Sequence, residues 1–97
     1  MKVIAIGHIG RKLSAYEQQQ HMRTEVVDTL KLYLNGVLEQ YWFRTDKPGV
    51  VFLMQVESSE DAEKILQALP LVEAGLLTFE LLPVGPLLPL GLLLQAA

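Results

Sequence analysis

The chain has 97 residues, of which 51% are hydrophobic and 20% are charged, and its 11 acidic and 8 basic residues give a net charge of −3. This length suits one small domain, and this composition is that of an ordered globular chain. The negative charge argues against a nucleic-acid-binding surface. Because the sequence has no cysteine, disulfides and thiolate chemistry are excluded.

The first part of the chain predicts a strand followed by a helix. Residues 2–9 are rich in valine and isoleucine, which is typical of a strand. Between residues 18 and 34 an apolar side chain recurs at every fourth position, which is a helical period. The pair Asn35-Gly36 follows directly and is a common signal for the end of a helix. The recurring residues are Met22, Val26, Leu30 and Leu34, with Tyr33 beside them.

The middle of the chain predicts a β-hairpin. Residues 37–44 and residues 50–57 are rich in aromatic and β-branched side chains, which favour strands. The segment between these two runs contains Pro48-Gly49, the residue types that a turn requires. Two apolar runs joined in this way are expected to pair as antiparallel strands.

The last part of the chain predicts a second helix and a final strand. Ser58 is a favourable N-cap, and Asp61, three residues later, is the acid that would complete a capping box. Pro70 is expected to end this helix, and residues 76–82 are expected to form the last strand. The order βαββαβ, with right-handed crossovers, predicts a ferredoxin-like α+β fold. In that fold a four-stranded antiparallel sheet carries both helices on one face.

The predicted hairpin carries large apolar side chains on both faces of the sheet. The alternation of apolar and polar residues that would mark a water-facing side is absent. Because an uncovered apolar sheet face is a surface for association, we expect two copies to stack face to face as a homodimer, or to form a larger homo-oligomer. The residues concerned are Leu38, Tyr41, Trp42, Phe43, Val51, Phe52, Leu53 and Met54.

The C-terminal segment is apolar and carries no charge after Glu80. Prolines and glycines divide it into pieces too short for a membrane-spanning helix. We expect residues 1–83 to form the domain and residues 84–97 to form an apolar arm that packs on a partner subunit. The alternative is that the arm folds back on its own sheet. Residues 1–7 do not resemble a signal peptide, so we expect a cytoplasmic protein without membrane contact.

Residues 37–83 are similar to known families. Their pattern resembles the muconolactone isomerase family of the dimeric α+β-barrel superfamily, in which a Trp-bearing strand, a hairpin, a helix and a Leu-Pro-Leu exit follow at closely similar spacing. Residues 72–81 are also similar to the last helix-to-strand passage of YCII-related proteins. This chain differs from the first family in its apolar tail and in having no histidine before His8. The matching residues are Tyr41, Trp42, Ser59, Ala62, Leu66, Leu69, Pro70 and Leu71.

The resemblance implies a homodimer whose sheets close into a barrel, with a pocket between sheet and helices for a small organic acid or lactone. The function predicted on this basis is that of a muconolactone isomerase-like enzyme, which acts by acid/base proton transfer without a cofactor or a metal. Two alternatives stay open. One is a non-catalytic oligomeric binding or assembly module of the same fold, and the other is a cofactor-free monooxygenase-like enzyme.

Three residues are candidates for the catalytic acid or base. His8 ends the first strand, near the expected opening of the pocket, and an imidazole titrates near neutral pH. His21 is followed by Glu25 four residues later, and that carboxylate could orient the imidazole. Glu39 would be costly to bury in a closed barrel unless it were paired, so a buried Glu39 would be a functional candidate. The alternative for both histidines is an ordinary solvated side chain.

Three residues of the second strand are candidates for substrate binding. Because side chains alternate along a strand, Glu39 and Tyr41 are expected on one face, and Trp42 and Arg44 on the other. Arg44 could hold a substrate carboxylate with two hydrogen bonds, and Tyr41 or Trp42 could stack on a flat ring. The alternatives are that the aromatic residues pack in the core or the dimer interface, and that Arg44 pairs with Asp46 or is exposed.

Overall fold

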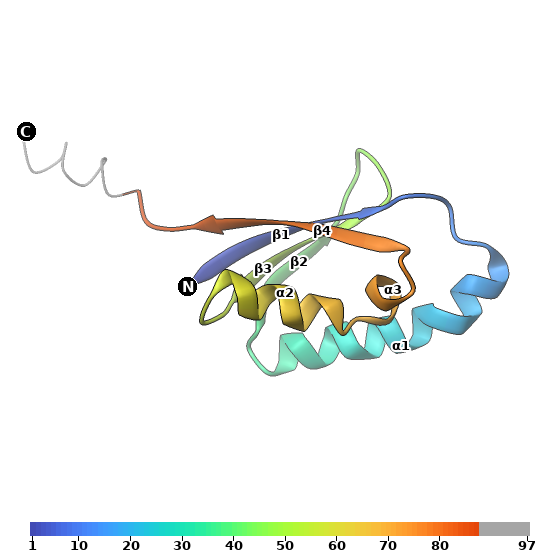
Figure 1. Ribbon diagram of the computed structural model, residues 1–97, viewed down its shortest axis with the longest axis horizontal. Helices are drawn as coiled ribbons and strands as arrows, with labels where there is room; N and C mark the ends of the chain where they lie inside the picture. The colour runs from blue at the N-terminus through green and yellow to red at the C-terminus, as the bar shows by residue number, and fades with distance from the viewer. Residues whose placement is uncertain (88–97) are drawn as a thin grey trace, which may run out of the picture.

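The computed structural model describes residues 1–87, which form a four-stranded antiparallel sheet with three helices on one face (Figure 1). The strands lie in the order β2-β3-β1-β4. This arrangement confirms the predicted ferredoxin-like α+β fold, to which it adds one short helix, α3. The elements are β1 (Lys2–Ile9), α1 (Ala15–Leu34), β2 (Leu38–Phe43), β3 (Val50–Gln55), α2 (Ser59–Gln67), α3 (Pro70–Glu73) and β4 (Leu77–Val84).

Helix α1 begins at Ala15, earlier than its hydrophobic period indicates, because Ser14 forms a complete capping box. Ser14 Oγ accepts a hydrogen bond from the Glu17 backbone N–H at 3.1 Å, and the Glu17 carboxylate accepts one from the Ser14 N–H at 3.0 Å. Arg11 donates two further hydrogen bonds to the same carboxylate. Arg11 and the Ser14 N–H together lower the pKa of Glu17 to about 2. The helix ends as predicted, with Gly36 in the left-handed region at φ +80°.

Ser58 caps α2 as predicted, because its Oγ accepts a hydrogen bond from the Asp61 N–H at 3.1 Å. Within residues 1–87 the Asp61 carboxylate makes no return bond to Ser58, so the predicted capping box is only half formed. Helix α2 already ends at Gln67, and Pro70 instead opens α3. Proline is well suited to the first turn of a helix, where its missing N–H costs nothing.

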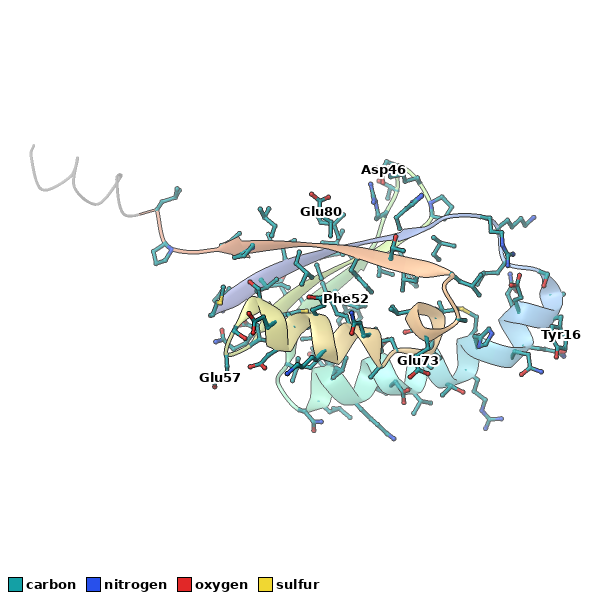
Figure 2. The ribbon with its side chains drawn as sticks, in the orientation of Figure 1. Tyr16, Asp46, Phe52, Glu57, Glu73 and Glu80 are labelled. Atoms are coloured by element: carbon teal, nitrogen blue, oxygen red, sulfur yellow. The ribbon has the colours of Figure 1, made fainter. Side chains whose placement is uncertain are left out.

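The hydrophobic core lies between the sheet and α2. Figure 2 places Phe52 there, between the strands and the helices. The apolar side of α2 faces this core: Ala62 and Leu66 are buried and Ile65 is partly buried against it. The buried cluster consists of Val3, Ala5, Leu38, Phe52, Met54, Val56, Ala62, Leu66 and Leu69.

Helix α1 contributes little to this core. The four residues of its stripe that follow Met22 are between 43% and 72% exposed, and the one buried residue of the helix is Glu25. The apolar side of α1 therefore borders a space rather than a packed layer. The exposed stripe residues are Val26, Leu30, Tyr33 and Leu34.

A β-bulge at the start of β2 changes which residues share a face. Leu38 pairs with Met54 and Gln40 with Leu53, so one extra residue, Glu39, lies between two consecutive pairs. The prediction that Glu39 and Tyr41 share a face is therefore wrong, because it assumed an unbroken alternation. Glu39 instead forms an ion pair with Lys2. Lys2 lies on the same side of β1 as Ile4 and Ile6, which is the side that faces away from the helices.

The sheet face opposite the helices is apolar at its centre. Ile4 and Ile6 of β1 lie beside Leu53 and Val51 of β3, and all four side chains are only partly buried. Trp42 and Leu82 extend the same face and are about half exposed. We call this surface, made of Ile4, Ile6, Trp42, Val51, Leu53 and Leu82, the open face.

Strand β4 runs two residues beyond its predicted end, to Val84, which pairs with Lys2. The sheet therefore includes the first residue of the segment that we expected to be an arm. Residues 85–87 are exposed, and the rest of that segment, residues 88–97, lies outside the described residues. None of the helices within residues 1–87 has the length and apolar character needed to cross a membrane.

Candidate functional site

A pocket of about 570 Å³ lies between α1 and the β2–β3 hairpin. Its lining is mostly apolar and aromatic. Among the described residues of the lining, Glu25 is the one acid and Arg44 the one base. The remaining lining residues are Ile9, Met22, Val26, Thr29, Leu30, Tyr33, Tyr41, Trp42, Phe43, Pro48, Gly49, Val50, Phe52, Leu71 and Leu77. An apolar cavity with a few polar groups is the usual form of a small-molecule site.

Glu25 is the buried ionisable group of this pocket, with only 7% of its surface exposed. Its Oε1 accepts a hydrogen bond from the Leu71 backbone N–H at 2.9 Å, and its Oε2 lies 3.4 Å from the Thr29 hydroxyl. Burial raises the pKa of Glu25, although these two hydrogen bonds and His21 act in the opposite direction. Asp28 adds a smaller upward contribution to that pKa. A carboxyl group with a raised pKa can serve as both the acceptor and the donor of a proton in acid/base catalysis.

Glu25 also has a structural role, because it joins α1 to α3. The N-cap residue of α3, Leu69, has no side chain that could accept a hydrogen bond from the helix N-terminus. The Glu25 carboxylate takes that place by accepting from Leu71. The sequence predicts Glu25 only as the partner of His21. The signal that could have found it is an acid directly beside the apolar stripe of α1.

Aromatic side chains form the walls of the pocket. The ring of Tyr33 on α1 lies edge-on to that of Tyr41 on β2, with centroids 5.3 Å apart and an interplanar angle of 80°. Phe52 is buried and contacts Phe79, with centroids 5.5 Å apart. Phe43, at the end of the edge strand β2, is 84% exposed. Flat, polarisable walls of this kind suit a planar ligand.

Arg44 lies at the hairpin end of the pocket, and its guanidinium is already occupied. Its Nε and Nη2 donate to the two carboxylate oxygens of Asp46 at 2.9 Å and 2.7 Å. Its Nη1 donates to the Gly7 carbonyl at 3.4 Å. The Arg44 guanidinium lowers the pKa of Asp46 to about 2. This is the ion pair with Asp46 that sequence reasoning gave as the alternative to a substrate clamp.

The structure brings together only some of the predicted site residues. Tyr41, Trp42 and Arg44 border the pocket. The register places the side chain of Tyr41 on the helix side of the sheet and that of Trp42 on the open face, so Tyr41 is the better placed of the two predicted stacking residues. His8 does not: it is exposed on β1, on the side of the sheet that faces away from the helices, and pairs with Thr78. His21 is half-buried on α1 outside the lining.

Two further observations concern the predicted acids. Within residues 1–87, no hydrogen bond joins His21 to Glu25, so the proposed His–Glu couple is not formed. Glu39 is outside the pocket lining and is exposed beside Lys2. It therefore lacks the burial that would have made it a functional candidate.

Glu25 should make the stability of the protein depend on pH. Its pKa in the folded state is raised, so the folded protein binds this proton more tightly than the unfolded chain does. The contribution of Glu25 to the free energy of unfolding is therefore greatest in acid and is lost as pH rises through the folded pKa. In urea titrations from about pH 4 to about pH 8, the free energy of unfolding of Glu25→Gln should fall less with pH than that of the wild type. Parallel curves for the two proteins would contradict this assignment.

Neither the family models nor the curated proteins contain a match to this chain. Among solved structures, the chain is similar to 5-chloro-2-hydroxyhydroquinone dehydrochlorinase from Burkholderia phenoliruptrix, whose structure is a complex with 2,5-dihydroxybenzoquinone. The TM-score is 0.70 at 14% sequence identity, and the match covers 88% of this chain and 94% of the other. At this identity the likeness concerns the fold alone. It places the chain among ferredoxin-like α+β domains.

Proposed function

We propose that this protein is a small-molecule enzyme that moves a proton on a planar organic ligand held in the pocket between α1 and the hairpin. The observation that carries the proposal is the buried Glu25 carboxyl, whose raised pKa accompanies an otherwise apolar and aromatic lining. Raised carboxyl pKa values in concave sites are typical of catalytic acids and bases. The structural neighbour, a dehydrochlorinase that was solved with a quinone, supports a small planar ligand for this fold.

The proposed reaction is a proton shift of the type that a muconolactone isomerase-like enzyme would perform. The Glu25 carboxylate removes a proton from the carbon between a carbonyl and a C=C bond, and the electron pair of the broken C–H bond is delocalised over both groups as a dienolate. The Glu25 carboxylic acid then returns the proton to the far carbon of the C=C bond, and the double bond moves next to the carbonyl. The product is an isomer of the substrate, so no oxidant, cofactor or further reactant is consumed.

The test is proton NMR of small butenolide lactones in deuterated buffer with the purified protein, using both uncharged butenolides and muconolactone, which also carries a carboxylate. We expect deuterium to enter the carbon acid position, or the lactone to isomerise, faster than in buffer alone. The absence of exchange and of conversion at high protein concentration, with ligand binding still visible, would leave the binding-module alternative. Oxygen-dependent loss of an aromatic probe would instead favour the monooxygenase-like alternative.

We also propose that the open face is the interface of a homodimer. The partly buried side chains of Ile4, Ile6 and Leu53 form an apolar surface on a one-layer sheet, and such surfaces are commonly covered by another chain. The packing of the arm, residues 84–97, on the partner subunit stays a prediction, since residues 88–97 lie outside the described part of the chain.

Placing a charge on the open face should break this dimer. We expect Leu53→Asp to lower the mass measured by light scattering from twice the chain mass to the chain mass at micromolar concentration, because an unpaired buried carboxylate is costly. The control is Leu34→Asp, which introduces the same charge on the exposed end of α1 and should leave the dimer intact. A wild-type protein that is monomeric throughout the micromolar range would contradict the proposal.

A further inference from the structure

Arg44 is the one cation in the lining of the pocket, among the residues that the structure describes. All three of its hydrogen-bonding nitrogens are engaged within the protein: Nε and Nη2 by the Asp46 carboxylate, and Nη1 by the Gly7 carbonyl. The two bonds to Asp46 are the paired, parallel bonds that a guanidinium makes to any carboxylate. Asp46 therefore occupies the position that the carboxylate of an acidic ligand would take.

We infer that Asp46 determines the charge of the ligand: by holding the Arg44 guanidinium, it makes the pocket selective for uncharged planar molecules over carboxylates. This inference rests on the proposed assignment of the pocket as the ligand site. It also narrows the predicted ligand class to lactones without a carboxylate, so an uncharged butenolide should bind more tightly than muconolactone or a small organic acid.

The two partners of the ion pair differ in how firmly they are held. The Arg44 side chain is only 15% exposed and is tied to the Gly7 carbonyl, whereas the Asp46 side chain is 63% exposed at the hairpin turn (Figure 2). The Asp46 carboxylate is nevertheless held in position to bind Arg44, because its Oδ1 also accepts a hydrogen bond from the Lys47 N–H at 2.9 Å. Its pKa of about 2 keeps it ionised at neutral pH.

A carboxylate that entered the pocket would meet two obstacles. It would have to displace Asp46 to reach Arg44, or else lose its hydration without gaining a cation. The same pocket also holds the Glu25 carboxyl, which repels an anion whenever it is ionised. An uncharged amide or lactone of the same shape meets neither obstacle.

The test compares benzoate with benzamide, which are similar in shape and differ in charge. We expect wild-type protein to bind benzamide more tightly than benzoate in NMR titrations. In the Asp46→Asn variant, the affinity for benzoate relative to benzamide should rise about tenfold, because the uncharged asparagine side chain cannot neutralise the Arg44 guanidinium. The asparagine still offers an oxygen to the Lys47 N–H, so the turn should be retained. Asp46→Ser is a second variant that removes the charge, in case the asparagine alters the turn.

Two further variants test whether the change in benzoate affinity comes from the Arg44–Asp46 pair or from the overall charge of the protein. Glu57→Gln removes one negative charge just after the end of β3 that lies away from the hairpin turn (Figure 2), and it should leave the benzoate-to-benzamide ratio unchanged. The double variant Arg44→Met, Asp46→Asn should lose the gain in benzoate affinity. An unchanged ratio of benzoate affinity to benzamide affinity in both Asp46 variants would overturn the inference. A wild-type protein that binds benzoate more tightly than benzamide, or that binds neither probe, would also overturn it. Because the ratio needs no turnover, an inactive protein with the expected ratio would contradict the proton transfer alone.

Discussion

Replacing Glu25 with glutamine should slow the proposed proton transfer by roughly two to four orders of magnitude, which is the usual contribution of a general acid or base. Glutamine is nearly isosteric and still presents an oxygen to the Leu71 N–H, so the link between α1 and α3 should persist. It cannot accept a proton at neutral pH. A large loss of rate in a folded Glu25→Gln protein would therefore report on the proton and not on the helix cap.

The control for this variant is Glu57→Gln, since Glu57 is an exposed carboxylate outside the pocket lining. Its rate of deuterium incorporation should match the wild type. The wild-type rate should also rise with pH through the raised pKa of Glu25, because only the carboxylate can remove a proton. A Glu25→Gln rate within about twofold of the wild type would assign Glu25 to the helix cap alone.

The fold was predictable because its local signals agree with one another. The hairpin carries its turn residues at Pro48-Gly49, and Ser58 and Gly36 mark helix ends where the structure has them. Each of these signals acts within a few residues of the chain. The later end of β4 was not predictable in this way, since Val84 is in the sheet only because Lys2 lies opposite it.

The candidate site was only partly predictable, because it depends on contacts between distant parts of the chain. Tyr41, Trp42 and Arg44 belong to the hairpin and were identified from their types. Glu25 is buried and accepts a hydrogen bond from the N–H of Leu71, which lies 46 residues later in the chain. No local sequence pattern predicts this contact between Glu25 and Leu71.

The predicted catalytic residues Glu39 and His8 show a second reason why the candidate site was only partly predictable. A single inserted residue in β2 is enough to move Glu39 to the side of Lys2, since strand faces alternate with a period of two. His8 was placed correctly at the end of β1, but the parity of the strand directs it away from the helices. The position along an element was therefore easier to predict than the face on which a side chain lies.

Gly49→Ala should destabilise the protein by about 3 kcal/mol or more, which is the upper range for inserting atoms into a packed site. A Cβ on Gly49 would overlap the carbonyl oxygen of Gly7, and this clash is with backbone, so no side chain can rotate away to relieve it. The hairpin end would have to separate from β1. Two backbone hydrogen bonds lie next to the contact between Gly49 and Gly7. The Ile9 N–H donates to the Pro48 carbonyl at 3.1 Å, and the Arg44 N–H donates to the Gly49 carbonyl at 3.0 Å.

Gly10→Ala is the matched control, because a Cβ there has no atom within 4 Å. The two variants add the same methyl group at the same end of the sheet, so the difference in Tm between them measures the close approach of Gly49 to Gly7. A domain of this size loses roughly 4–8 °C of Tm per kcal/mol, so Gly49→Ala should unfold at least about 10 °C below Gly10→Ala. Equal Tm values would mean that the hairpin end can move away from β1 at little cost. Arg44 would then have no fixed position at the pocket, since its Nη1 is held by the Gly7 carbonyl.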